Sequence, residues 1–545
     1  MKKVSKPENP DKTKATKKDK KDEINPLLDV IENMDPDTLT ALLHSMQRET
    51  GFAPELLSPE DPVELFSEYL DSCAHANAND DDKNEIIADL FEVLDELRVA
   101  RNGGDPEARA EMQAIYDLLD DAIEHHSLPG PDLMMIGKLL HDAGWVVPDS
   151  LKQALTEAVQ ARAPNMGGAR DEDLASSLLE AAEAGQNSFE IYKILSSFLA
   201  CFPFEACSVL LSGFVVGKRA ELSQAVAGFL LHADAGVAQS VAAILAASAG
   251  KTPVGSSLIE RLVRMRPWVP QSRQAQLDST IRAMRLNALP PIKVEAPKTI
   301  KCYASVCDGS GTRSLFVTQR LGRNYQIATV MLKPSGVADA LVVREISKSE
   351  MDGLVREMRS SITVEETNLA AITRMLALAI SDNFVSGNPP PFELVEVAES
   401  LGLGPVYPDN SSPSEIISGL LSTLPPEQTN AAATAKAHAD ILDSDFAHQW
   451  FEAGEALEDL LFSVRGSKRR ADNLVKAYLP GRRIFWARQC ALSALVLRDG
   501  AKADHSLWKQ LALVGRDIAS ELPLDKIPLM KRIAELSVRV FESRL

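Results

Sequence analysis

Residues 300–346 read IKCYASVCDGSGTRSLFVTQRLGRNYQIATVMLKPSGVADALVVREI, and they form the longest stretch of the chain without a helical pattern. Apolar and polar residues alternate from Ile300 to Val306, which is the period-two pattern of a half-buried strand. Three turn signals then divide the stretch: Asp308-Gly309-Ser310-Gly311, Gly322-Arg323-Asn324 and Pro334-Ser335-Gly336. We therefore predict a four-stranded antiparallel β meander, followed by a helix, within residues 298–362.

The rest of the chain shows mostly the helical period, so we expect a mainly α protein in which α-solenoid or helical-bundle arms flank the small meander. A disordered basic tail (1–23) should precede an acidic helical domain (24–163), and residues 164–170 should be a linker. Beyond it we expect a helical region (171–289), the meander with its helix (298–362), helices and loops (363–428) and a C-terminal helical domain (429–545). No apolar run reaches the roughly 18 residues of a membrane span, and the richest, Val237–Ala249, is too short.

Charge is distributed very unevenly along the chain, whose net charge is −19. Residues 22–124 hold 28 acidic residues and only five basic ones, whereas residues 1–21 hold nine lysines. Residues 465–498 hold nine basic residues against Asp472 alone, with Tyr478, Phe485 and Trp486 among them. Such segregation indicates surfaces that attract partners of the opposite charge.

The region 204–289 contains a series of short helical segments separated by short breaks. In one of them, Asp234 is followed by Val237, Val241 and Leu245 at helical spacing. This pattern resembles the second helix of a HEAT-type repeat, although Ala238 stands where such repeats often carry Arg. The resemblance implies stacked helix pairs that bury a shared face, and it concerns architecture only.

Several helix boundaries can be predicted after the meander. Thr363 with Glu366 has the spacing of a capping box, so a helix should begin there, and Ser412-Pro413 should open a short one. Phe446–Val464 should form one helix. The aromatic residues of the C-terminal helices should be core residues: Trp450, Phe451, Trp486 and Trp508.

One pattern carries a catalytic alternative. A strand that runs into Asp308, followed by further strands and a helix bearing Glu357, resembles the start of a ribonuclease H-like nuclease. The resemblance implies two Mg²⁺ ions held by Asp308, Glu357 and Asp382 for phosphoryl transfer. Asp308, however, lies in a turn signal, and residues 369–380 have a helical pattern where that family needs a strand. An Asp-Gly turn between antiparallel strands explains Asp308 equally well.

The basic window is the second candidate site. Basic side chains beside aromatic ones can hold a phosphate backbone and stack on bases, or they can be a solvated helix face. We predict that this window contacts something acidic: nucleic acid, a protein, or the chain's own 22–124 block. The residues expected to bind are Arg465, Lys468, Arg469, Arg470, Arg482, Arg483 and Arg488.

The sequence therefore favours a non-enzymatic binding or scaffolding protein that uses helical surfaces. A nucleic-acid-associated protein and the metal-dependent nuclease remain alternatives. The cysteine and histidine spacings match no zinc site, so we expect no metal and no cofactor. The six cysteines form no disulfide framework, which favours a reducing cytoplasm, and we expect a protein partner and no membrane.

Overall fold

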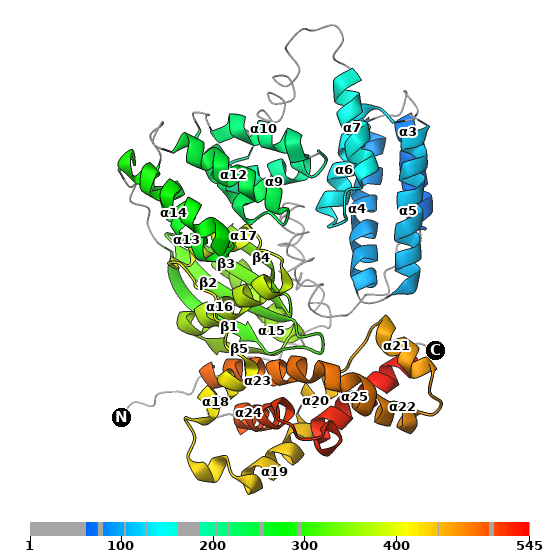
Figure 1. Cartoon of the computed structure of the whole chain (residues 1–545), viewed down its shortest axis with the longest axis vertical. Coiled ribbons are helices and arrows are strands. Elements are labelled where there is room, and N and C mark those ends of the chain that lie inside the picture. The colour runs from blue at the N-terminus through cyan, green and yellow to red at the C-terminus, as the bar shows by residue number, and fades with distance from the viewer. Residues whose placement is uncertain are drawn as a thin grey trace, which may run out of the picture.

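The computed structural model describes residues 61–74, 80–102, 105–125, 128–161, 185–202, 204–215, 219–249, 255–290, 297–444, 446–500 and 506–543. The predicted basic tail and the predicted linker at 164–170 lie outside these residues. The described chain is mainly α-helical with one antiparallel sheet, as the sequence predicts. Figure 1 shows a helical bundle at the N-terminal end, a second helical group, the sheet with its helices, and a C-terminal helical layer below the sheet.

The N-terminal bundle comprises α3 (Pro62–Ala74), α4 (Asp80–Asn102), α5 (Pro106–Glu124), α6 (Gly130–Asp142) and α7 (Asp149–Ala161). Asp105 caps α5 by accepting a hydrogen bond from the Glu107 backbone N–H at 2.9 Å. The apolar face of α6 is buried, including Ile136 and Leu140. Trp145 then fixes the bundle from inside, because its indole N–H donates to the Leu94 carbonyl at 2.8 Å.

The second helical group comprises α9 (Ser188–Leu199), α10 (Phe204–Val215), α11 (Ala220–Gly228), η1 (Phe229–Leu231), α12 (Ala235–Ser248), α13 (Ser256–Met265), η2 (Arg266–Trp268) and α14 (Gln271–Leu286). Asp234 caps α12 through the backbone N–H groups of Gly236 and Val237. Val241 and Leu245 are fully buried, so the stripe noted in the sequence is the inner face of α12.

The sheet contains β1 (Lys298–Ser305), β2 (Arg313–Leu321), β3 (Asn324–Lys333), β4 (Gly336–Ile346) and β5 (Val364–Thr367), in the order β4-β3-β2-β1-β5. The four-stranded meander is therefore confirmed, but a fifth strand pairs with its open edge. Residues 364–367 pair antiparallel with β1, for example Tyr303 opposite Glu366. The predicted capping box at Thr363 is wrong, since the next helix begins at Leu369 and is capped by Asn368.

Helices cover both faces of the sheet. One face packs on α15 (Lys348–Ser361), whose Met351 and Met358 meet Ile327 and Phe316. The opposite face packs on α16 (Leu369–Ser386) and α17 (Glu393–Ser400), and both of these helices contact β4 extensively. Double coverage explains why β3 is apolar on both faces.

Among the described helices, α16 alone has the length and composition of a helix that could cross a membrane, whereas the sequence analysis expects no such segment. Half of this helix is buried, and residues such as Met375 and Ala379 belong to the same core as the sheet. Core packing against the sheet accounts for its apolar composition.

The C-terminal layer comprises α18 (Pro413–Leu421), η3 (Pro426–Gln428), α19 (Ala431–Asp440), η4 (Ile441–Asp443), α20 (Phe446–Gln449), α21 (Glu455–Phe462), α22 (Ser467–Asn473), η5 (Leu474–Tyr478), η6 (Leu479–Arg482), α23 (Arg483–Asp499), α24 (Ser506–Ala519), η7 (Leu524–Lys526) and α25 (Pro528–Ser543). Ser412 opens α18, as predicted, and the structure adds a capping box between Ser412 and Glu415. The single helix predicted at 446–464 is wrong, because the chain leaves α20 at Trp450 and turns at Gly454, whose φ is +129°. Trp450, Trp486 and Trp508 are buried, as predicted, whereas Phe451 is half-buried.

Candidate functional site

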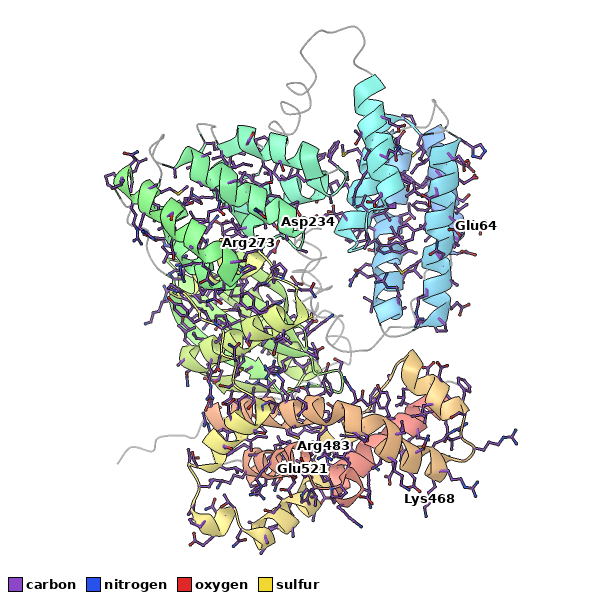
Figure 2. The ribbon with its side chains drawn as sticks, viewed as in Figure 1. Glu64, Asp234, Arg273, Lys468, Arg483 and Glu521 are labelled. Atoms are coloured by element: carbon purple, nitrogen blue, oxygen red, sulfur yellow. The ribbon has the colours of Figure 1, made fainter. Side chains whose placement is uncertain are left out.

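Four basic residues of the 465–498 window form an exposed surface, which we call the α22 surface: Arg465, Lys468, Arg469 and Lys476. They lie just before α22, on it and within η5. None of them makes an ion pair within the part of the chain that the structure describes. Figure 2 shows Lys468 pointing away from the ribbon at the edge of the C-terminal layer. This surface is therefore available for an acidic partner.

Arg470 lies on the same helix but points inward. Its Nη1 donates to Glu542 at 2.8 Å, and its Nε donates to the carbonyls of Leu461 and Val464. The guanidinium also lies 5.2 Å from the centre of the Phe541 ring. Arg470 thus connects α21, α22 and α25, and it is a structural residue rather than a contact for a partner.

Arg482 and Arg483 are likewise engaged inside the C-terminal layer. Arg482 donates to Glu452 at 2.8 Å and lies over the Phe485 ring at 3.8 Å. The same Glu452 oxygen accepts from the Trp486 indole N–H at 2.7 Å, and the Glu452 side chain is only 6% exposed. Arg483 donates to the backbone carbonyls of residues 518, 520 and 522, at the end of α24.

Arg488 makes the longest-range ion pair of the window among the described residues. Its Nη2 donates to both carboxylate oxygens of Asp382 on α16, each at 2.7 Å. Four of the seven residues predicted to bind a partner therefore hold the fold together: Arg470, Arg482, Arg483 and Arg488. Their carboxylate and carbonyl partners lie outside the window whose charge was counted, so a count of charge within the window does not register them.

The aromatic residues of the window do not form a stacking platform. Trp486 is fully buried, and Phe485 is half-buried beneath Arg482. Tyr478 is half-buried, and burial raises the pKa of its hydroxyl. Bases stack on exposed ring faces, so this part of the pattern does not offer what single-stranded nucleic acid needs.

The three carboxylates of the nuclease alternative lie on different elements and do not come together. Asp308 lies in the loop between β1 and β2, where it accepts from the Thr312 backbone N–H and the Ser310 hydroxyl, both at 2.8 Å. Asp382 lies on α16 and is held by Arg488. Glu357 lies on α15, which covers the opposite face of the sheet from α16. Within the described residues no three metal-ligating side chains form a group.

Asp308 and Asp382 do lie near a buried cluster that the sequence analysis missed. Burial raises the pKa of both carboxyl groups, and Arg488 opposes this effect at Asp382. At the centre is Arg313, the first residue of β2, which is 2% exposed and interacts electrostatically with Cys307, Arg488 and Asp382. The available signal was an arginine at the start of a strand, shortly before the apolar run Leu315-Phe316-Val317.

The β1–β2 loop (residues 306–312) brings this cluster against the C-terminal layer. The Trp450 indole N–H donates to the Cys307 carbonyl at 3.0 Å, and the Cys307 backbone N–H donates to Ser493 at 3.2 Å. A side chain at Gly309 would lie 2.6 Å from the Gln449 carbonyl oxygen, so only glycine allows this approach. The loop is thus fitted closely into the layer formed by α20 and α23.

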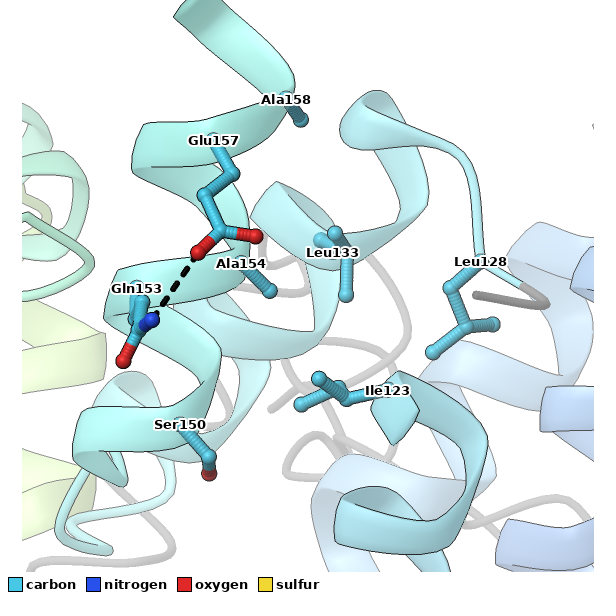
Figure 3. A pocket seen from close by; sticks show the side chains of 8 residues that line it. All are labelled: Ile123, Leu128, Leu133, Ser150, Gln153, Ala154, Glu157 and Ala158. Atoms are coloured by element: carbon cyan, nitrogen blue, oxygen red, sulfur yellow. Dashed lines mark hydrogen bonds between the residues drawn. The ribbon is translucent and has the colours of Figure 1, made fainter. Parts of the chain in front are cut away.

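A separate pocket lies in the N-terminal bundle between α5, α6 and α7, with a volume of about 480 Å³ (Figure 3). Apolar residues such as Leu133 and Ala154 line it. Its polar groups are already engaged, since Gln153 donates to Glu157 at 2.9 Å and Ser150 donates to Asp120 at 2.6 Å. The pocket offers apolar contact and few free polar groups.

Fold and site together define a mainly helical protein with one five-stranded antiparallel sheet and a basic surface on its C-terminal helical layer. Two family models match parts of the chain: the Y4lR second domain at residues 203–287 and the Y4lR C-terminal helical domain at residues 414–542. The chain is also 25% identical over 492 residues to the uncharacterized protein y4lR of Sinorhizobium fredii (strain NBRC 101917 / NGR234), covering 87% of each chain. No solved structure matches it. The α22 surface lies within residues 414–542, the stretch that matches the Y4lR C-terminal helical domain.

Proposed function

We propose that this chain is a non-enzymatic binding or scaffolding protein whose α22 surface docks an acidic partner protein. One observation carries the proposal: the basic window divides into an inner group with partners inside the fold and an outer group without them. Arg465, Lys468 and Arg469 are exposed, and no carboxylate of the described residues pairs with them. Exposed charges of one sign speed the encounter with a complementary surface and orient it.

An apolar contact point lies beside these charges. Phe462 at the end of α21 is 59% exposed, and the edge of its ring packs against Phe541 at 4.9 Å between centroids. A rigid, exposed aromatic ring next to Arg and Lys side chains has the composition of a protein-binding hot spot. This combination favours an acidic polypeptide over nucleic acid.

Nucleic-acid association is the second candidate function, and the basic residues of the α22 surface and of the sequence at 1–21 favour it. Trp486 is buried and Phe485 is half-buried beneath Arg482, which counts against base stacking, so this function would rest on phosphate contacts alone. The ribonuclease H-like alternative has less support, because its three carboxylates lie apart and Asp382 is already paired.

The helical arms support a scaffolding role, since stacked short helices present extended surfaces to partners. We place the protein in the cytoplasm as part of the proposal. Five cysteines of the described chain are free and buried, which suits a reducing compartment. An acidic partner could also be the chain's own 22–124 block, in the same molecule or in a second copy.

The test compares binding of fluorescent poly-glutamate and of a short DNA duplex across a salt series. The variant Arg465→Glu/Lys468→Glu/Arg469→Glu should bind poly-glutamate about tenfold more weakly than the parent, because three exposed attractions become repulsions. The matched control Arg285→Glu/Arg323→Glu/Lys348→Glu reverses the same number of exposed charges elsewhere and should bind like the parent.

Binding by the parent should weaken as salt rises, because the Debye length shrinks. Equal binding by the parent and the α22 variant would mean that the surface is only solvated, and the proposal would fail. A parent that prefers the duplex, with the preference lost in the α22 variant, would assign the surface to nucleic acid instead.

A further inference from the structure

Arg313 is a buried cation without a hydrogen-bonded partner. Its side chain begins at the first residue of β2, and the residue is only 2% exposed. Its Nε and Nη1 atoms have no hydrogen-bond acceptor among the residues that the structure describes. A guanidinium stays protonated in proteins, and a buried, unpaired charge is costly. In solution, a bound molecule or ion should therefore supply the acceptor that the protein atoms do not provide.

The neighbouring acidic groups do not serve as that acceptor. Asp382 gives both of its oxygens to Arg488 at 2.7 Å. Asp308 is turned into its own loop, where it accepts from Thr312 and Ser310. The Cys307 thiol is close enough to interact electrostatically, but burial raises its pKa, so it is neutral near pH 7. Arg313 and Arg488 therefore lie near the same carboxylate, Asp382, and both oxygens of that carboxylate already accept from Arg488.

A free acceptor lies at the same loop. The Gln489 side-chain carbonyl oxygen is buried and has no donor within the described part of the chain, and the residue is 2% exposed. Gln489 packs on the loop so tightly that a side chain at Gly311, whose φ is +86°, would lie 2.5 Å from its Nε2 atom. The junction between the β1–β2 loop and α23 therefore presents unpaired donors from Arg313 together with an unpaired acceptor from Gln489.

We infer that this junction binds a small protonated oxyanion of the phosphate class, with Arg313 donating to its oxygens and Gln489 accepting its hydroxyl hydrogen. Dihydrogen phosphate carries both kinds of group, and its single negative charge matches the one positive charge that remains when Asp382 neutralises one of Arg313 and Arg488. Because Arg313 and Gln489 are each 2% exposed, the occupant is a free ion and not a nucleotide or a lipid headgroup. Sulfate accepts equally well but has no hydrogen to donate, and chloride is weaker still.

The inference is tested by thermal melting of the full chain in phosphate, sulfate and chloride at equal pH and ionic strength. Phosphate should raise the melting temperature of the parent by about 2–4 °C over chloride, with sulfate between them. Arg313→Gln should lose this response, whereas the exposed control Arg285→Gln should keep it. A parent that melts identically in phosphate and chloride would overturn the inference and leave buried water as the partner of Arg313.

A second variant decides the matter if Arg313→Gln does not fold. Gln489→Glu keeps the shape of the side chain and places a fixed carboxylate at the junction. It should melt higher than the parent in chloride and no longer respond to phosphate; a phosphate response that persists in it would contradict the inference. The α22 charge-reversal variant must keep the response, since a loss there would mean that phosphate binds the exposed surface. That result would leave the proposed docking function untouched.

Discussion

Arg261 of α13 donates from Nε and Nη2 to the two carboxylate oxygens of Glu399, at the end of α17, each at 2.8 Å across 138 residues of sequence. The Arg261 side chain is 4% exposed, and its guanidinium lies 4.4 Å from the centre of the Phe189 ring. Nη1 donates to Ser188 at 2.8 Å. This one side chain therefore joins α9 and α13 of the second helical group to the helices that cover the sheet.

Arg261→Ala should weaken the contact between the second helical group and the helices that cover the sheet, where Arg264 still donates to Glu399 at 3.4 Å. It leaves Glu399 without its bidentate partner in a partly buried site, which should cost about 3 kcal/mol of unfolding free energy. Arg266→Ala is the matched control, since the Arg266–Asp278 pair lies within the second group and is about one-third exposed on each side. Denaturant unfolding should show a much smaller loss for the control; equal losses would contradict the assigned role of Arg261.

The inner and outer arginines of the C-terminal layer should respond differently to charge reversal. Arg482→Glu places a second carboxylate against Glu452, which is 6% exposed, and should cost about 2–4 kcal/mol. Arg469→Glu changes only an exposed side chain and should stay within about 0.5 kcal/mol of the parent. Urea denaturation of the two variants measures the difference, and similar stabilities would show that Arg482 is not part of the fold.

Gly336 at the turn between β3 and β4 should tolerate no side chain. Its φ is +119°, and a Cβ atom there would lie 2.3 Å from the Asn383 side chain, which pairs with both the N–H and the carbonyl of Val337. Gly336→Ala should therefore lose about 3 kcal/mol or more. Gly402→Ala, at φ +65° with open space around it, should lose about 1–2 kcal/mol. Equal losses would mean that Asn383 moves aside.

Acid should weaken the contact between the N-terminal bundle and the second helical group. His141 on α6 lies 3.4 Å from Ser196 of α9 and interacts electrostatically with His232. Burial lowers the pKa of both histidines, although Asp142 and Asp234 oppose it and Lys138 reinforces it at His141. Because the folded state disfavours their protonation, stability is fully present above about pH 6.5 and falls as the pH drops below that value.

The double variant His141→Gln/His232→Gln should flatten this dependence in denaturation curves at pH 7.5 and 5.5. His125→Gln is the control: this histidine is exposed, and its pKa is raised mainly by its hydrogen bond to the Asp121 carbonyl, so it cannot cause an acid loss. A control that flattens the curve as much as the double variant would rule out the interface histidines.

Local patterns predicted the fold well where one physical rule acted alone. Alternation in residues 300–306 and the three turn signals that follow gave the four strands of the meander, and Ser412-Pro413 gave the start of α18. The fifth strand was missed because its four residues are all half-buried and show no alternation. Thr363 and Glu366 have capping-box spacing, but pairing with the open edge of β1 prevails over this local preference.

The site was predicted less well, for a related reason. Counting charge in the 465–498 window found the exposed residues Arg465, Lys468 and Arg469, and it also included arginines whose partners are distant in sequence. Arg488 pairs with Asp382, 106 residues away, and Arg470 pairs with Glu542, 72 residues away. The net charge of residues 465–498 contains no information on partners that lie elsewhere in the sequence. Arg313 was missed because its isolation is a property of packing.

The contacts of the β1–β2 loop with the C-terminal layer also determine the order in which parts of the fold can form during synthesis. Cys307 leaves the ribosome 143 residues before Trp450, whose indole closes over its carbonyl. Until that later segment has emerged, the loop lacks its cover, and Arg313 remains open to solvent water. The sheet can therefore pair its strands early, but its loop end reaches its final form only after the last quarter of the chain has been translated. A nascent chain stalled before Trp450 would display that loop to chaperones and proteases.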